Sequence, residues 1–411
     1  MKQQLRIKIC LFLNYFVFAF LLNSVGAVIL QVQRNFSVSK SDASLLEGFK
    51  DLPIAIASFL LASLLPKLGL KKSMLIALAL VGLGCLVMPF ANEFWYFKIL
   101  FLVIGVSFAL IKVTVFATIG LITNNQKEHS SLMSSIEGFF MVGVLLGNVI
   151  FSLFVDDSNP ASTAWLNVYW LLAGLSFVAF FILFITPLDE KEAVIEERSL
   201  GDDFLAMLKM IALPLIMVFI CSVFLFVLIE QSFQTWTPTF YKDILSLPAS
   251  MAIQAGAILA GAFAIGRLMA GYILKKVSWL PVVLTCISGA AIMVLISLPL
   301  AKNIVVDGSV NWFSAPLVAY VFPLMGLFLA PIYPIINSIT LSALPKHMHA
   351  SMSGLIVVFS ALGGTAGSMI TGNVFEHFSG QTAFYLSLIP MVLLALSVIL
   401  FKNLQKKTRF E

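Results

Sequence analysis

Charged residues are scarce in this chain. Only 11% of the 411 residues are Asp, Glu, Lys or Arg, whereas 60% are hydrophobic, and the mean hydropathy is +1.02. Soluble globular domains carry about 25% charged residues, so this composition excludes an ordinary soluble protein. The net charge of +5 reflects basic residues between the apolar runs and gives no indication of nucleic-acid binding.

Cysteine and histidine are also rare, with four of each. The cysteines lie far apart inside apolar runs, a spacing that favours core packing over a disulfide or metal site: Cys10, Cys85, Cys221 and Cys286. The histidines fall in predicted loops, which argues against a histidine proton relay: His129, His347, His349 and His377. The chain has neither a GxxxxGK phosphate-binding loop nor a catalytic-triad pattern. We therefore predict no enzymatic activity, no cofactor and no metal.

What the chain does have is a series of apolar runs. Each has about the 20 residues that a helix needs to cross ~30 Å of hydrocarbon. Backbone groups in lipid have no water to bind, so these runs must be helices. The sequence predicts an all-α polytopic membrane protein with 12 transmembrane helices, at 8–30, 43–65, 74–92, 97–121, 132–155, 166–187, 207–232, 251–274, 280–300, 315–341, 350–372 and 382–402.

Basic residues in the predicted loops indicate the orientation. Seventeen Lys and Arg residues lie on the side that holds both termini, and five lie on the other. Loops rich in Lys and Arg stay in the cytoplasm, so both termini are expected to be cytoplasmic, in the cytoplasmic (inner) membrane. The first run is too long for a signal peptide and lacks a small-residue cleavage site, so we interpret it as a retained helix.

The only long polar connection predicts a division into two halves. We expect a six-helix bundle at 1–187, a cytoplasmic linker at 188–206, and a second six-helix bundle at 207–411. Ala62 and Gly271 stand 209 residues apart, and each precedes a basic turn on the cytoplasmic side. Such a parallel repeat of six helices, related by an axis along the membrane normal, is typical of the major facilitator architecture.

The first basic turn resembles the loop signature of the major facilitator superfamily, G-x-x-x-D-R/K-x-G-x-R/K-R/K. Ala62 stands where the signature has Gly, and Pro66 stands where it has the acid. The missing acid removes a charge lock between helices. The matching positions, to which the resemblance assigns a gating role, are Lys67, Gly69, Lys71 and Lys72.

The C-terminal half resembles the fucose–galactose–proton symporter family and related sugar carriers. The segments that carry this resemblance are LIEQSFQTWTPTFY, GAFAIGRLMAGYILKK, GLFLAPIYPIINS and ALGGTAGSMITG. The resemblance implies two pseudo-symmetric six-helix bundles and proton-coupled sugar import. The N-terminal half departs from that family, which carries a membrane acid on helix 1 and another on helix 4. Here helix 1 offers amides such as Asn23, and helix 4 offers a base, Lys112.

Several charges lie inside the predicted helices, where they are costly and mark functional sites. Lys112 and Glu137 lie on neighbouring helices, and we expect them to form a structural salt bridge, a proton switch, or an anion contact through Lys112. Glu47, Lys50 and Asp51 share one helix face, and were expected either at a solvated outer rim or at an entry for substrate or protons. We predict Glu137, Glu47 and Glu230 as candidate proton-coupling acids.

Polar and aromatic side chains of helices 7 and 10 suggest a solute site. Acid, amides and an aromatic plane together suit a sugar, whose hydroxyls need donors and acceptors. With Lys112 and Asn23, the predicted substrate contacts are Gln231, Gln234, Trp236, Tyr333 and Asn337. Pro331 and Pro334 should bend helix 10. Arg267 is predicted to be structural, paired near the cytoplasmic ends of the helices or with an acidic loop residue.

These features predict a monomeric secondary active transporter. Its partners would be protons, the lipid bilayer and a small hydrophilic solute such as a sugar, a sugar derivative or an organic anion. The alternatives are a proton-driven exporter of drugs or siderophores, and a lipid-handling protein or receptor.

Overall fold

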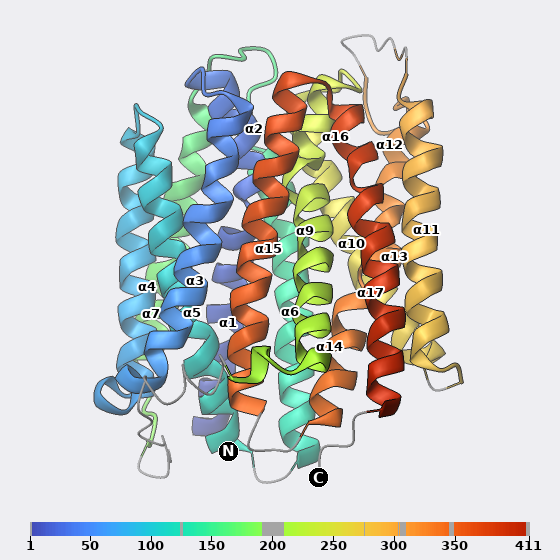
Figure 1. Cartoon of the computed structure of the whole chain (residues 1–411). Coiled ribbons are helices and arrows are strands. Elements are labelled where there is room, and N and C mark those ends of the chain that lie inside the picture. Colours follow the sequence, from blue (N-terminus) through green and yellow to red (C-terminus); the bar gives the residue numbers. More distant parts are fainter. Residues whose placement is uncertain are drawn as a thin grey trace.

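The computed structural model describes residues 2–123, 126–190, 209–274, 276–302, 304, 310–344 and 349–407. Throughout these ranges the regular structure is helical and no strand occurs. The predicted linker at 188–206 lies mostly outside the described residues, so its boundaries stay a prediction. Both chain ends lie at the same end of the molecule (Figure 1).

The first half of the chain contains the helices of the expected first bundle. They are α1 (Lys2–Asn23), α2 (Val25–Asn35), α3 (Lys40–Leu68), α4 (Leu70–Val87), η1 (Met88–Phe90), α5 (Trp95–Ile122), α6 (Gln126–Ser152), η2 (Ala164–Asn167) and α7 (Val168–Ile185).

The second half follows the same plan with more interruptions. Its helices are α9 (Pro214–Asp243), α10 (Ala249–Ile273), α11 (Trp279–Leu300), α12 (Val318–Val321), η3 (Phe322–Leu324), α13 (Met325–Leu329), α14 (Ile332–Ala343), α15 (His349–His377), α16 (Gly380–Leu386) and α17 (Leu388–Lys407).

Three predicted membrane runs are broken: the first, the tenth, and the twelfth, which is divided at Ser387 between α16 and α17. The first is divided at Ser24, whose hydroxyl donates to the Leu21 carbonyl at 2.8 Å. The tenth passes through η3 at Pro323 and breaks again between Leu329 and Ile332, which confirms the interruption predicted from its prolines. A proline has no N–H to donate and its ring clashes with the preceding turn, so it kinks or breaks the α-helix.

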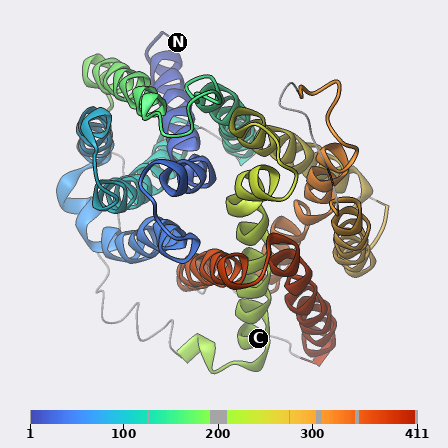
Figure 2. The same ribbon diagram turned by 90° about the horizontal axis from the view of Figure 1, so that it is seen from above.

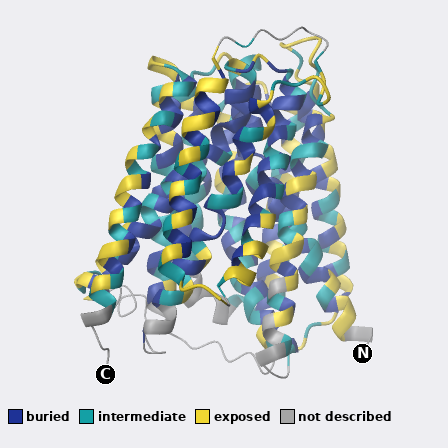
Figure 3. Ribbon diagram, turned by 90° about the vertical axis from the view of Figure 1, so that its right-hand side faces the viewer, coloured by how far each residue is buried: buried dark blue, intermediate teal, exposed yellow. Residues whose placement is uncertain are grey.

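Eleven segments of the described chain are long and apolar enough to cross a membrane. The helix α3 is not among them, and it carries Glu47, Lys50 and Asp51 within two turns. With α3, the count agrees with the 12 predicted spans. Exposed apolar side chains such as Leu153, Ile185 and Leu268 cover the outside, and buried residues fill the interior (Figure 3). This is the expected pattern for a bundle surrounded by lipid.

The helices form two groups that face each other (Figure 2). In the first group α1 packs on α6, and α4 packs on α5 and α7; in the second α9 packs on α17 and α10 on α13. The groups meet along three helix pairs: α3 with α15, α6 with α10, and α2 with α9. We refer to the end that holds Lys2 and Lys407 as the terminal end, and to the end that holds Asn35 and Asp243 as the far end.

Candidate functional site

Polar contacts join the two halves at the far end. The Lys40 ammonium lies 2.9 Å from the Asp243 carboxylate, and the Ser41 N–H donates to Glu376 Oε2 at 2.7 Å. On the opposite side of the molecule, the Ser250 N–H donates to Asp157 Oδ1 at 3.2 Å. These contacts hold α3 to α9 and α15, and the loop after α6 to α10.

Below these contacts lies a buried cluster of three charges on α3. The Glu47 side chain is 0% exposed and the Lys50 side chain 8%. Lys50 Nζ forms an ion pair with Glu47 and lies 3.5 Å from Asp51 Oδ1. The expectation of a solvated rim is therefore wrong in this conformation: α15 packs on α3, and Gln231 and Thr235 of α9 contact Glu47.

The cluster also bridges the two halves. The Gln231 amide donates to Glu47 Oε1, and the Thr235 hydroxyl donates to Glu47 Oε2 at 2.9 Å. Both donors lie on α9, one turn apart. Gly364 of α15 makes room for the third charge, because a Cβ there would lie 2.4 Å from Asp51 Oδ2. Gln231, predicted as a substrate contact, is thus engaged with Glu47 in this conformation.

Contacts between α6 and α10 weaken toward the terminal end. Near the far end the Gln254 amide donates to the Ser152 hydroxyl at 3.0 Å. Further along, the closest polar contact is 3.8 Å, from Arg267 to the Met141 sulfur. Beyond it, a Cβ added at Gly138 or Gly271 would meet no atom within 4 Å. Among the described residues, the halves are closed by polar contacts at the far end, and the positions of Gly138 and Gly271 nearer the terminal end are open.

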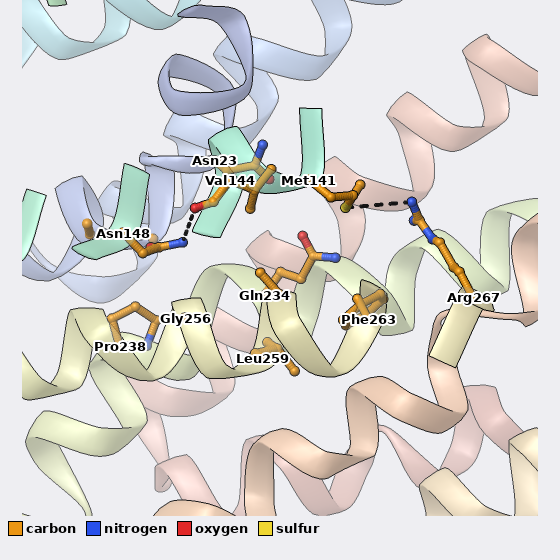
Figure 4. A pocket seen from close by; sticks show the side chains of 13 residues that line it. Asn23, Met141, Val144, Asn148, Gln234, Pro238, Gly256, Leu259, Phe263 and Arg267 are labelled. Atoms are coloured by element: carbon orange, nitrogen blue, oxygen red, sulfur yellow. Dashed lines mark hydrogen bonds between the residues drawn. The ribbon is translucent and has the colours of Figure 1, made fainter. Parts of the chain in front are cut away.

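A cavity lies between the halves; about 560 Å³ of space, part of it open solvent, lies within its lining. Three of its lining residues were predicted as site or gating residues, and they come from three helices: Asn23, Gln234 and Arg267 (Figure 4). Sequence reasoning missed Asn148 and Met141, which line it from α6. An amide within the apolar run of α6 was the available signal for Asn148. The remaining lining is mostly apolar: Gly26, Ala27, Val144, Pro238, Gly256, Leu259, Ala260 and Phe263.

Among the described residues, Arg267 does not form the structural pair that the sequence suggested; most of the acidic linker lies outside them. Within the described chain no carboxylate lies within 4.0 Å of its guanidinium. One N–H group contacts the Met141 sulfur at 3.8 Å, and the buried Nε finds no partner among the described residues. The reason is position: Arg267 faces the cavity from the inner turns of α10.

Lys112 and Glu137 also remain unpaired. No ion pair of 4.0 Å or less joins them among the residues that the structure describes. Lys112 Nζ lies 6.0 Å from the centre of the Phe108 ring, and Glu137 is exposed on α6. The expected salt bridge is therefore absent in this conformation, although the two charges still interact at longer range.

Other predicted contacts lie beside the cavity rather than in its lining. Trp236 is 0% exposed, and its indole N–H donates to the Ser368 carbonyl at 3.0 Å, so it packs α9 against α15 instead of facing a solute. Tyr333 shares a hydrogen bond of 3.2 Å with Ser360. Asn337 is half-buried, and its Oδ1 has no partner among described residues. Glu230 accepts a hydrogen bond of 3.3 Å from Gln234.

A carboxylate from a distant part of the sequence binds the basic turn after α3. Glu190 accepts hydrogen bonds from the Leu70 N–H at 2.8 Å and the Lys71 N–H at 2.7 Å, and the Lys71 ammonium donates to the Phe184 carbonyl at 2.9 Å. Gly69 has a φ of +80°, which favours glycine. Lys72 is exposed, and the side chain of Lys67 lies outside the described residues. Sequence reasoning missed Glu190, which lies far from this turn in sequence.

Comparisons with known proteins agree with this architecture. "Protein TsgA homolog" of Buchnera aphidicola subsp. Schizaphis graminum is 24% identical over 408 residues, 96% of each chain. A bacterial homolog of the human lysosomal transporter Spinster, solved inward-facing and unoccupied, matches with a TM-score of 0.77 and 13% identity over 100% of this chain and 99% of that one. The E. coli fucose:proton symporter FucP matches with a TM-score of 0.63 and 14% identity over 98% and 99%.

The sequence profile of the Major Facilitator Superfamily matches residues 11–368. That range includes α1 to α14 and most of α15, and thus all three helix pairs along which the halves meet. The chain belongs to the major facilitator superfamily and is a transporter, not an enzyme.

Proposed function

We propose that the protein moves a small hydrophilic solute together with protons, by alternately opening the cavity at its two ends. The state described here is closed at the far end. Membership of the superfamily and the similarity to a fucose:proton symporter support this reading. The excess of basic residues on the side of the termini supports cytoplasmic termini in the cytoplasmic membrane.

The observation that carries the proposal is the cluster of Glu47, Lys50 and Asp51. Two carboxylates share one ammonium, so the fully ionised cluster holds one negative charge in excess. Uncompensated buried charge is costly, and binding a proton removes that cost. When the far end opens, Glu47 must lose its bonds from Gln231 and Thr235. Proton occupancy and conformation therefore depend on each other through the same carboxylate.

Purified protein in liposomes loaded with a pH-sensitive dye tests this coupling. A panel of sugars, sugar acids, nucleosides and amphiphilic drugs is added under a proton gradient, and both accumulation and the internal pH are followed. We expect E47Q to lose uphill accumulation while solute counterflow continues, because a neutral amide cannot carry a proton. D42N, an acid-to-amide change at the exposed start of the same helix, is the matched control.

Two other variants, E137Q and E230Q, test the remaining predicted coupling acids. Normal uphill accumulation in E47Q would remove Glu47 from the coupling role. Transport of the drugs alone, outward and against their gradient, would favour the exporter instead.

Orientation is tested separately in a variant that lacks the native cysteines. F313C, at a fully exposed far-end position, should react with a membrane-impermeant maleimide in intact cells, and N403C near the terminal end should not. The reverse labelling pattern would overturn the proposed orientation.

A further inference from the structure

Arg267 places a positive charge in the wall of the cavity, and among the described residues no carboxylate lies within 4.0 Å of it. A guanidinium has five N–H donors and matches the two oxygens of a carboxylate or the oxygens of a phosphate. Here the contacts on record are a single 3.8 Å approach to the Met141 sulfur, a weak acceptor, and a buried Nε without a partner among described residues. Leaving a partly buried cation in this state costs free energy, which an incoming oxyanion would recover.

The amides around the cavity have side-chain oxygens that can still accept hydrogen bonds. The side-chain nitrogens of Asn23, Asn148 and Gln234 already donate, to the Ala19 carbonyl at 2.9 Å, the Val144 carbonyl at 3.1 Å and Glu230 at 3.3 Å. Among described residues, no hydrogen-bond donor reaches the oxygen of any of these three amides. The cavity therefore offers acceptors to a hydroxylated or amino-bearing molecule and donors, at Arg267, to an oxyanion.

Glu230 is the acid that competes for the same guanidinium. It lies one turn from Gln234 on α9, and its charge interacts with that of Arg267 across the gap between α9 and α10. From α14, Tyr333 lies within range of both charges. The cluster of α3 meets α9 at Gln231 and Thr235, on the turns that follow Glu230. The titratable groups on α2, α15 and α17, which also pack on α9, lie toward helix ends: Arg34 on α2, His349, Glu376 and His377 on α15, and Lys402, Lys406 and Lys407 on α17.

We propose that the transported solute carries an oxyanion, a carboxylate or a phosphate, which binds Arg267 in place of Met141, while donor groups of the solute bind Asn23, Asn148 and Gln234. The proposal deepens the proposed function, since it rests on this cavity being the transport site. Arg267 can neutralise one negative charge at a time. The solute anion therefore binds best when Glu230 is protonated, which joins solute and proton in one step.

Binding to the purified full-length protein tests the proposal. The probes are D-glucose, D-glucuronate, D-gluconate, D-glucose 6-phosphate and L-lactate, each at pH 6 and pH 8. Binding is detected first as a rise in the unfolding temperature of the protein, and its affinity is then measured by calorimetry. At least one anionic probe should bind the wild type, and D-glucose should not. The carboxylates and the sugar phosphate then distinguish the two kinds of oxyanion.

The variants assign the anion to its residue. R267Q should weaken anion binding by roughly ten- to a hundredfold, the value of a charge-assisted hydrogen bond. R267K keeps the charge but loses the two-pronged geometry, and should keep the preference for anions with weaker binding. If R267Q fails to fold, R267K still tests the proposal, because it retains the positive charge. R6Q, the same change at an exposed position on α1, should bind like the wild type.

The pH arm tests the competition with Glu230. Wild-type affinity for the anion should fall between pH 6 and pH 8, and E230Q should remove most of that fall. Three outcomes would each overturn the proposal. Neutral probes could bind as tightly as anionic ones, or no anionic probe could bind at all. Anion binding could also survive in R267Q and instead be lost in K112M.

Failure of this proposal can be told apart from failure of the proposed function. Proton-driven accumulation of a neutral sugar would retain the transport mechanism and remove the anion. Anion binding at Arg267 without proton movement would retain the anion and remove the coupling.

Discussion

Glu47 illustrates how one carboxylate can sense the position of two helix bundles. Its oxygens accept from Lys50 on its own helix and from Gln231 and Thr235 across the interface. In the low dielectric of a buried site such bonds are strong, and losing one leaves a costly unsatisfied group. Opening of the far end would break the two bonds that Glu47 accepts from α9.

Lys112 and Glu137 lead to a prediction at the scale of residues. No ion pair of 4.0 Å or less links them, but their charges interact at longer range, so their contributions to stability should be weakly coupled. The double variant K112M/E137Q should unfold at a temperature close to the sum of the two single shifts, with a coupling well below the roughly 3–5 kcal/mol that removing one partner of a buried pair costs.

Thermal unfolding of the wild type, both single variants and the double variant completes this cycle. A double variant that recovers stability lost in K112M would show that the pair exists after all.

At the scale of elements, the breaks in helices and the caps at their ends give the chain its turning points. The tenth run is divided into α12, η3, α13 and α14 at its prolines. The turn between α3 and α4 is held differently, by a glycine at φ +80° and a carboxylate that binds the first N–H groups of α4. An anion at a helix N-terminus satisfies free donors and complements the helix dipole.

Glu190 is therefore predicted to stabilise the start of α4. E190Q should lower the free energy of unfolding by about 0.5–2 kcal/mol, since a neutral amide retains at best one of the two bonds and none of the charge interaction. The measurement is the thermal midpoint of the purified protein. E93Q removes an exposed acid before α5 and serves as the control; equal midpoints for E190Q and E93Q would contradict the capping role.

At the scale of the whole molecule, the two bundles are joined at one end and apart at the other. The far end carries hydrogen bonds and an ion pair between the halves, including Ser250 with Asp157 and Lys40 with Asp243. Toward the terminal end the positions of Gly138 and Gly271 are open. Such an arrangement needs only a rocking motion of one bundle against the other to expose the cavity to the opposite side.

Two cysteine pairs should report this asymmetry. In a variant without the native cysteines, D157C/S250C should form a disulfide readily, because these side chains already touch, whereas G138C/G271C should not. A protease site placed in the linker separates the halves on a gel unless the disulfide joins them. Equally fast cross-linking of both pairs would show that the far-end closure is not the dominant state.

The sequence alone determined the fold class, the 12 spans and the shared end of the two termini. Run length, helix breakers and loop charge are local properties of the chain, and lipid permits only helices across such runs. The same reasoning identified Glu47, Asn23, Gln234 and Arg267 as exceptional, because polar groups inside apolar runs need a special environment.

Only the tertiary structure decided which partners these residues have. Glu47 accepts hydrogen bonds from residues more than 180 positions away in the chain. Glu190 binds the start of α4 across more than 110 positions. Trp236 was expected to contact the solute and instead packs against Ser368. Arg267 was expected to form an ion pair and instead lines the cavity. Partners across helices depend on the rotation and height of each helix in the packed bundles, and no local pattern of residues specifies these.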